Sequence, residues 1–129
     1  MKSLCDCNVL IVDDTETNVD MLVEALGDDY EVMVAMDGED ALEMAAEEPQ
    51  DLILLDVMMP GMDGFEVCEK LKLSPETASI PVIFMTGKTD KEDRDRGMAL
   101  GAIDYIFKPF DIVDVQTRIK AHLTKIIEG

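Results

Sequence analysis

The sequence contains no tryptophan, a single histidine and three cysteines, and aromatic residues make up only 5% of its 129 positions. Cys5, Cys7 and Cys68 are an odd number without the spacing of a disulfide framework, which is typical of a reducing compartment. The apolar runs reach only four or five residues, far short of the roughly 20 that cross a bilayer. The N-terminal residues lack the apolar stretch of a secretory signal. We therefore expect a cytoplasmic protein without a transmembrane helix.

Positive charge is also scarce in this chain. It carries 11 Lys and Arg against 29 Asp and Glu, which gives a formal net charge of −18. A charge of this sign repels a phosphate backbone and an anionic leaflet, so it argues against direct nucleic-acid binding and against membrane binding. An apolar fraction of 47% is too high for a disordered acidic tail and indicates a folded domain.

The length suits one compact domain, and no linker-like segment interrupts it. We assign residues 8–127 to this domain and residues 1–7 to an N-terminal extension. Residues 128–129 form a C-terminal tail that cloning could have added. Several methionines occupy core-like positions, and we interpret them as fillers of the core: Met33, Met36, Met44, Met85 and Met98.

Two apolar patterns alternate along the domain. Short continuous runs predict strands that are buried on both faces, at 9–12, 32–36, 52–55, 82–85 and 105–107. Helical spacing and the remaining gaps predict helices at 19–26, 37–48, 64–73, 90–100 and 112–126. Five βα units of this kind predict an α/β fold, a doubly wound (βα)5 flavodoxin-like three-layer sandwich with a parallel sheet in the order 2-1-3-4-5.

Polar residues directly follow four of the predicted strands. They are Asp13-Asp14, Asp56, Thr86 and Lys108. In an open α/β sheet the carboxyl ends of the strands form the ligand crevice, at the point where the strand order reverses. Three carboxylates gathered there repel one another unless a cation neutralises them, and hard oxygen ligands of this type suit Mg²⁺. The sequence thus predicts a magnesium site that leaves coordination positions open for phosphate oxygens.

Four segments carry a resemblance to a known family. They are Val9-Leu10-Ile11-Val12-Asp13-Asp14, the stretch from Asp56 to Gly64, Met85-Thr86-Gly87, and the stretch from Gly101 to Phe110. With these segments the chain resembles the receiver domains of two-component response regulators over about residues 8 to 127. The match is specific because each segment lies at the end of a predicted strand and the order along the chain is the family's order.

The resemblance implies a role for each of these residues. Asp56 would be the phosphoacceptor, which takes a phosphoryl group from a phosphohistidine in an in-line displacement. Asp14 and Asp56 would bind Mg²⁺ directly, for which Mn²⁺ could substitute, Asp13 would bind it through water, and the backbone carbonyl of Met58 would add a ligand. Lys108 would pair with Asp56 before transfer and with a phosphoryl oxygen afterwards.

Two further residues would form a switch by the same resemblance. Thr86 would donate its hydroxyl to a phosphoryl oxygen and move toward it, and Tyr105 would turn inward as Thr86 moves. The peptide bond between Lys108 and Pro109 would be cis. Such a domain is a signalling switch rather than an enzyme, with slow Mg²⁺-dependent autophosphorylation from acyl phosphates and slow autodephosphorylation.

Each role has a simpler structural alternative. Asp13 and Asp14 could cap the first helix, although one Asp would suffice for a cap. Thr86 could be a strand-end hydroxyl that bonds to nearby backbone, Lys108 a solvated surface lysine and Tyr105 a packing residue. His122, near the end of the last helix, suits the helix dipole and is not expected to carry phosphate.

Two other functions share the expected architecture. A flavodoxin-like FMN carrier needs a Ser/Thr/Gly-rich phosphate loop after the first strand, where this chain has Asp13-Asp14-Thr15-Glu16. A haloacid-dehalogenase-like phosphatase needs a second acidic residue two positions after its nucleophile, where this chain has Met58. The receiver interpretation therefore predicts different partners: a sensor histidine kinase or a His-phosphotransfer protein as donor, an output domain or effector protein, and a phosphorylation-promoted homodimer through residues 90–127.

Overall fold

The computed structural model describes residues 3–87, 91–108 and 111–128 of the chain. A short 3-10 turn, η1 (Leu4–Asp6), precedes five βα units. The strands are β1 (Asn8–Val12), β2 (Glu31–Ala35), β3 (Leu52–Asp56), β4 (Val82–Thr86) and β5 (Asp104–Phe107). The helices are α1 (Glu16–Leu26), α2 (Gly38–Glu47), α3 (Gly64–Leu73), α4 (Lys91–Ala99) and α5 (Ile112–Glu128).

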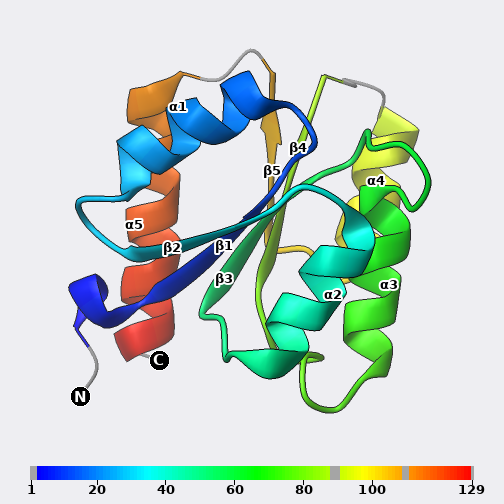
Figure 1. The fold of residues 1–129 in the computed structure, drawn as a ribbon, viewed down its shortest axis with the longest axis horizontal. Coiled ribbons are helices and arrows are strands. Elements are labelled where there is room, and N and C mark those ends of the chain that lie inside the picture. Colours follow the sequence, from blue (N-terminus) through cyan, green and yellow to red (C-terminus); the bar gives the residue numbers. More distant parts are fainter. Residues whose placement is uncertain (1–2, 88–90, 109–110, 129) are drawn as a thin grey trace.

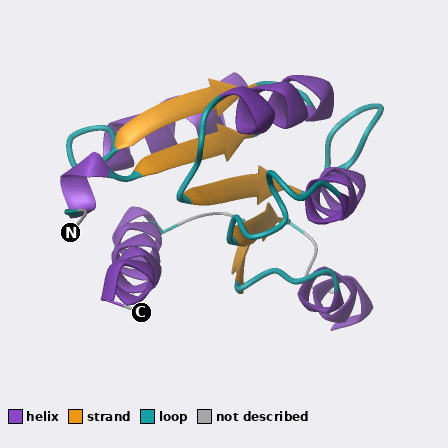
Figure 2. Cartoon of the chain, turned by 90° about the horizontal axis from the view of Figure 1, so that it is seen from below, coloured by secondary structure: helices purple, strands orange, loops and turns teal. Residues whose placement is uncertain are grey.

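All strand pairs are parallel, and the sheet order is β2-β1-β3-β4-β5. Helices α1 and α5 cover one face of the sheet and α2, α3 and α4 cover the other (Figure 1). Viewed at right angles, the strands form one twisted layer between the two helical layers (Figure 2). The predicted doubly wound, flavodoxin-like fold with strand order 2-1-3-4-5 is confirmed.

The central strands are apolar on both sides because helices cover both faces of the sheet. Every residue of β3 and of β4 is buried. Their side chains alternate between two cores, so Leu55 and Phe84 pack toward α2 and α3 while Leu54 and Met85 pack toward α1 and α5.

Strand β2 differs from the expectation. It begins one residue earlier than the apolar run 32–36, and four of its five residues are exposed or only partly buried. The reason is its place at the edge of the sheet, where it pairs with β1 alone. An apolar run therefore identified a strand correctly but overstated its burial.

The start of α3 brings that helix against the end of β3. The Asp63 side chain accepts a hydrogen bond from the Glu66 N–H and caps the helix. A Cβ atom on Gly64 would overlap the backbone of Asp56 and Val57, and the Gly64 N–H donates to the Val57 carbonyl at 3.0 Å. Glycine at this position lets the loop after β3 turn tightly beside Asp56.

Candidate functional site

Three carboxylates meet at the carboxyl edge of the sheet. Asp13 and Asp14 follow β1 and Asp56 ends the neighbouring strand β3. One oxygen from each of the three carboxylates lies within 4.8 Å of the others, so they could hold a single metal ion. Asp13 and Asp56 are buried, with 0% and 1% of their surface exposed, whereas Asp14 is exposed. The cluster is thus open to solvent on the side of Asp14.

Lys108 joins two of these carboxylates. Its Nζ lies 3.3 Å from Asp13 Oδ2 and 3.2 Å from Asp56 Oδ1. The lysine follows β5 and is held there because its backbone N–H donates to the Thr86 carbonyl at 2.7 Å. The predicted set of Asp13, Asp14, Asp56 and Lys108 therefore comes together at one place, from segments that are up to 95 positions apart in the sequence.

The charge balance of the pocket makes the Asp56 carboxylate more basic than an ordinary aspartate. Burial raises the pKa of the Asp56 carboxyl to about 6, and the neighbouring Asp13 carboxylate adds to the rise, while Lys108 and the Met58 N–H oppose it. One ammonium thus offsets two buried carboxylates only in part. A cation bound by the cluster would remove the remaining repulsion.

The donor set fits Mg²⁺. Mg²⁺ prefers oxygen ligands, commonly uses one or two carboxylates and keeps several waters. Asp13, Asp14 and Asp56 offer only carboxylate oxygens, and the exposure of Asp14 leaves room for water.

Thr86 and Tyr105 lie beside the pocket on β4 and β5. Thr86 is buried at the end of β4, and the register places Tyr105 opposite Phe84 on that strand. The Tyr105 ring is 5% exposed and packs between Phe84 and Phe107, with ring centroids 5.9 and 5.4 Å away. Tyr105 is therefore on the inside of the molecule in this structure.

The Tyr105 hydroxyl is buried without a well-formed hydrogen bond to any described residue. Burial raises the pKa of this phenol, the Asp93 charge adds to the rise, and the Thr86 hydroxyl opposes it. A buried hydroxyl of this kind is poorly satisfied, which suits a side chain that can take more than one position.

Met58 follows Asp56 by two positions and is 55% exposed. Its backbone N–H donates to Asp56 Oδ1 at 3.3 Å, so the loop after β3 curls around the carboxylate. The expected cis bond involves Pro109, which lies outside the described residues.

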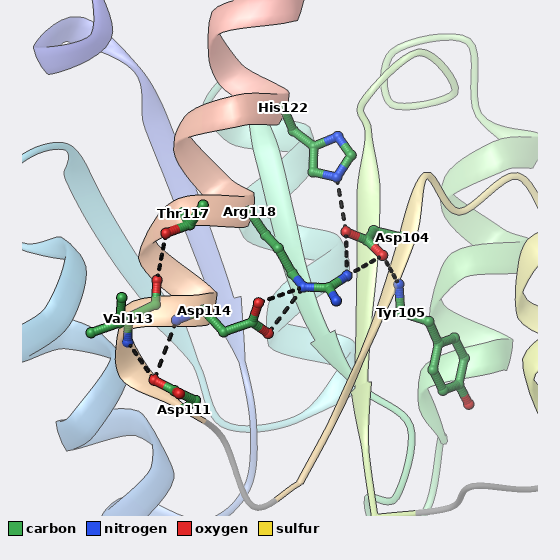
Figure 3. A network of polar contacts seen from close by, with 8 residues as sticks. All are labelled: Asp104, Tyr105, Asp111, Val113, Asp114, Thr117, Arg118 and His122. Atoms are coloured by element: carbon green, nitrogen blue, oxygen red, sulfur yellow. Dashed lines mark hydrogen bonds and ion pairs between the residues drawn. The ribbon is translucent and has the colours of Figure 1, made fainter.

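A second polar network was not anticipated from the sequence. Arg118 on α5 binds Asp104 through Nη1 at 2.9 Å and Asp114 through Nε at 3.0 Å, and His122 Nε2 lies 2.9 Å from Asp104 Oδ2 (Figure 3). The Tyr105 N–H donates to Asp104 at 2.8 Å. This network attaches α5 to the start of the strand that carries Tyr105 and leads to Lys108.

A signal for this network did exist in the sequence. Asp114 and Arg118 have the i, i+4 spacing of a helical ion pair, and Arg118 and His122 share the same face one turn apart. The sequence did not indicate that Arg118 and His122 both contact Asp104, because Asp104 lies on a different element, β5.

One pocket lies away from the carboxylates. Its volume is about 570 Å³, and it lies between α4, β5 and α5. Its lining includes Arg94, Tyr105 and Arg118. The carboxylate cluster and this pocket are therefore on different parts of the surface, and Tyr105 of β5 lines the pocket.

Comparisons with known proteins agree with this picture. The family model of the response regulator receiver domain matches residues 9–120. A probable cyclic di-GMP phosphodiesterase of Vibrio cholerae is 45% identical over 123 residues, covering 95% of this chain and 28% of that protein. Response regulator PleD of Caulobacter vibrioides is 50% identical over 114 residues, covering 88% of this chain and 25% of that protein.

Solved structures show the same fold. A CheY-like response regulator receiver domain protein of Methanospirillum hungatei superimposes with a TM-score of 0.87 at 32% identity, covering 96% of this chain and 99% of that one. The two relatives by sequence are much longer, and the chain spans about a quarter of their length.

Proposed function

The chain belongs to the response regulator receiver domain family, and from this premise we propose that Asp56 accepts a phosphoryl group from a phosphohistidine of a partner protein. The observation that carries the proposal is the position of Asp56, buried beside Asp13 and paired with Lys108 at 3.2 Å. A buried aspartate beside two further carboxylates and one lysine is suited to accept a group that needs charge neutralisation.

The two oxygens of Asp56 differ in their contacts. Within the described chain, the recorded contacts of this carboxylate go to Oδ1, which pairs with Lys108 and accepts from the Met58 N–H. We assign the nucleophile to Oδ2. It attacks phosphorus in line with the P–N bond of the donor, that bond breaks with its electrons remaining on the imidazole nitrogen, and an acyl phosphate forms on Asp56.

The pocket would hold Mg²⁺ through Asp14 and Asp56, with Asp13 binding through water and the Met58 carbonyl adding a ligand. The ion would supply positive charge for the phosphoryl oxygens. Lys108 would leave its contact with Asp56 Oδ1 and bind a phosphoryl oxygen, which keeps the added charge paired. Slow transfer from small acyl phosphates and slow hydrolysis of the acyl phosphate would follow from the same arrangement.

Phosphorylation adds close to two negative charges at this edge of the sheet and biases a two-state equilibrium. Thr86 would donate its hydroxyl to a phosphoryl oxygen, and the vacated space would stabilise the inward position that Tyr105 already occupies in this structure. The change would reach the face formed by α4, β5 and α5, where we place a phosphorylation-promoted contact with a second copy through residues 90–127. The proposed donors are a sensor histidine kinase or a His-phosphotransfer protein, and the proposed receiver of the signal is an output domain or effector protein.

Neither an FMN carrier nor a haloacid-dehalogenase-like phosphatase gains support. The segment after β1 carries the Asp13-Asp14 pair of the receiver family, and Met58 stands where such a phosphatase needs an acid.

The decisive experiment is the intact mass of the protein after incubation with Mg²⁺ and acetyl phosphate. We expect a gain of one phosphoryl group in the wild type, and no gain in Asp56→Asn or after chelation of the metal. Asp63→Asn serves as a matched control, because Asp63 lies on the same loop but caps α3 through the Glu66 N–H at 2.9 Å. Phosphorylation of Asp56→Asn to the wild-type extent would refute the assignment.

A wild-type protein that gains no mass is tested next with beryllofluoride, which imitates the phosphoryl group. Chemical-shift changes at Asp56, Thr86 and Lys108 would then show a working pocket that lacks only a suitable donor. Absence of both phosphorylation and beryllofluoride binding would refute the proposed function.

A further inference from the structure

Charge is unevenly distributed along this chain. Residues 3–69 contain 20 of the 29 acidic residues and no Lys or Arg, whereas residues 70–129 contain ten of the 11 basic residues. Because the sheet order is β2-β1-β3-β4-β5, the first segment forms the half of the molecule that ends at β2. The second segment forms the half that ends at β5. The sequence asymmetry thus becomes a difference between the two edges of the sheet.

The edge strand β2 has backbone groups that face away from the sheet. The Glu31 N–H donates to the Cys7 carbonyl at 2.9 Å, and the Ala35 carbonyl accepts from the Asp13 N–H at 3.2 Å. Along a strand, the N–H and C=O groups of successive residues point to opposite sides. The N–H and C=O groups of Val32 and Val34 therefore point away from β1. Within the described residues no recorded hydrogen bond joins these groups to another element.

This edge has few of the features that usually prevent pairing. Exposed edges are commonly protected by charged side chains, above all Lys, by Pro or by a bulge, and the charge within β2 is Glu31 alone. Strand β2 contains neither Lys nor Pro, and its register with β1 is continuous over five residue pairs, from Asn8↔Glu31 to Val12↔Ala35. The strand is therefore regular enough to accept a further strand along its outer side.

Exposed acidic residues lie at both ends of β2. Glu31 lies in the strand, Asp37 follows it, and Glu39 and Asp40 begin α2. We call these four residues the acidic rim. Asp28 and Asp29 precede the strand, but they line a pocket that also contains Lys120 of α5. Because a lysine shares that pocket, we leave both residues out of the rim.

We propose that the β2 edge binds an extended, Lys- or Arg-rich segment of a partner protein as an additional strand. The Val32 and Val34 backbone groups would pair with the segment, and the acidic rim would select its positive charge. A second copy of this chain is a poor occupant, because pairing two β2 edges would bring two acidic rims together. The site lies on the edge opposite β5 and needs no phosphoryl group, so it is tested independently of Asp56.

The test uses the unphosphorylated full chain and two synthetic peptides of 12 residues. One alternates Lys and Val, and the other alternates Lys and Pro. Both carry the same charge, but the second lacks the N–H group at every second residue and favours the polyproline II conformation over a β-strand. We expect the Lys–Val peptide to bind about tenfold more tightly in calorimetry, a difference that corresponds to about 1.4 kcal/mol. It should also slow hydrogen exchange at the Val32 and Val34 amides.

Two double variants separate the rim from general attraction to an acidic protein. Glu31→Lys with Glu39→Lys should weaken binding of the Lys–Val peptide by about fivefold or more. Glu76→Lys with Asp95→Lys makes the same change of net charge at exposed positions outside the rim and should weaken it by less than about twofold. Equal binding of the two peptides, equal effects of the two double variants, or exchange protection elsewhere than β2 would each overturn the proposal.

Discussion

At the scale of single residues, the charge of Asp56 lowers the stability of the folded state. The carboxylate is buried next to Asp13, and its pKa is about 6, against 3.8 for an ordinary aspartate. The folded state therefore binds a proton more tightly than the unfolded state, so this residue lowers stability as the pH rises through the window from about 4 to 6. At neutral pH the whole of that cost is present.

We therefore predict that Asp56→Asn stabilises the metal-free protein. At pH 7.5 the gain in the free energy of unfolding should be about 2 kcal/mol, because the substitution removes the buried charge and leaves Lys108 its contact with Asp13. Near pH 3.5 the variant and the wild type should be equally stable. Urea unfolding in the presence of a chelator, repeated across this pH range, measures the difference.

Two controls accompany this prediction. Asp95→Asn changes an exposed carboxylate on α4 and should leave stability nearly unchanged. Saturating Mg²⁺ should raise the stability of the wild type more than that of Asp56→Asn, because the variant has lost a proposed ligand. A variant that is less stable than the wild type at pH 7.5 without metal would show that the Asp56 charge is compensated in the folded state.

At the scale of elements, α4 is the helix with the least apolar attachment. Gly97 is buried, whereas the other residues of α4 whose side chains are described are exposed or partly exposed. A Cβ atom on Gly97 would lie 2.9 Å from the Phe84 ring and 3.1 Å from the Tyr105 ring. The helix thus rests on these two rings through a residue without a side chain.

We predict that Gly97→Ala destabilises the protein by about 1–2 kcal/mol, although alanine favours a helix. The reason is that the added methyl group must displace α4 or the two rings. Urea unfolding measures the change, and the near-ultraviolet circular dichroism of tyrosine reports the displacement of Tyr105. Asp95→Ala is the matched control on the same helix, and it should be neutral or slightly stabilising. A gain in stability for Gly97→Ala would mean that α4 is not seated on Phe84 in this way.

At the scale of the whole molecule, the net charge of −18 opposes compactness. Salt screens repulsion between exposed charges, with a Debye length of about 10 Å at 0.1 M. We predict that raising NaCl from 20 to 500 mM in the presence of a chelator increases Tm by about 3–5 °C.

Differential scanning calorimetry measures this increase, and KCl and choline chloride should give the same result at equal ionic strength. A fall in Tm with salt would mean that favourable ion pairs, such as Arg118 with Asp104 and Asp114, outweigh the repulsion.

Sequence patterns that act within one element were sufficient for most of the architecture. The apolar runs and helical spacing gave five βα units, and the strand order followed because few arrangements satisfy right-handed crossovers and two covered faces. The polar residues at the strand ends could be grouped for the same reason, since parallel strands bring their carboxyl ends to one edge. Residues 85–87 and 101–108 lie in two of the segments that carry the family resemblance. The family model of the receiver domain matches residues 9–120, which include both segments.

Properties that depend on neighbours in space required the tertiary structure. Met36 and Met98 were expected in the core but are 41% and 43% exposed, because a hydropathy pattern does not say which strand is at an edge or which helix is loosely attached. A hydropathy pattern also does not indicate that one side of β2 is unpaired within the described residues, or that His122 contacts Asp104.

The amino-acid sequence by itself determined the fold class, the family and the residues gathered at the carboxyl edge of the sheet, because these follow from local periodicity and from a short list of topologies. Only the tertiary structure decided how the charges in that pocket balance, since the pKa of Asp56 depends on its burial and on its distances to Asp13 and Lys108. It also decided that Tyr105 lies inside and that β2 leaves an acidic edge open. Burial and pairing are properties of positions in space, and a linear pattern does not contain them.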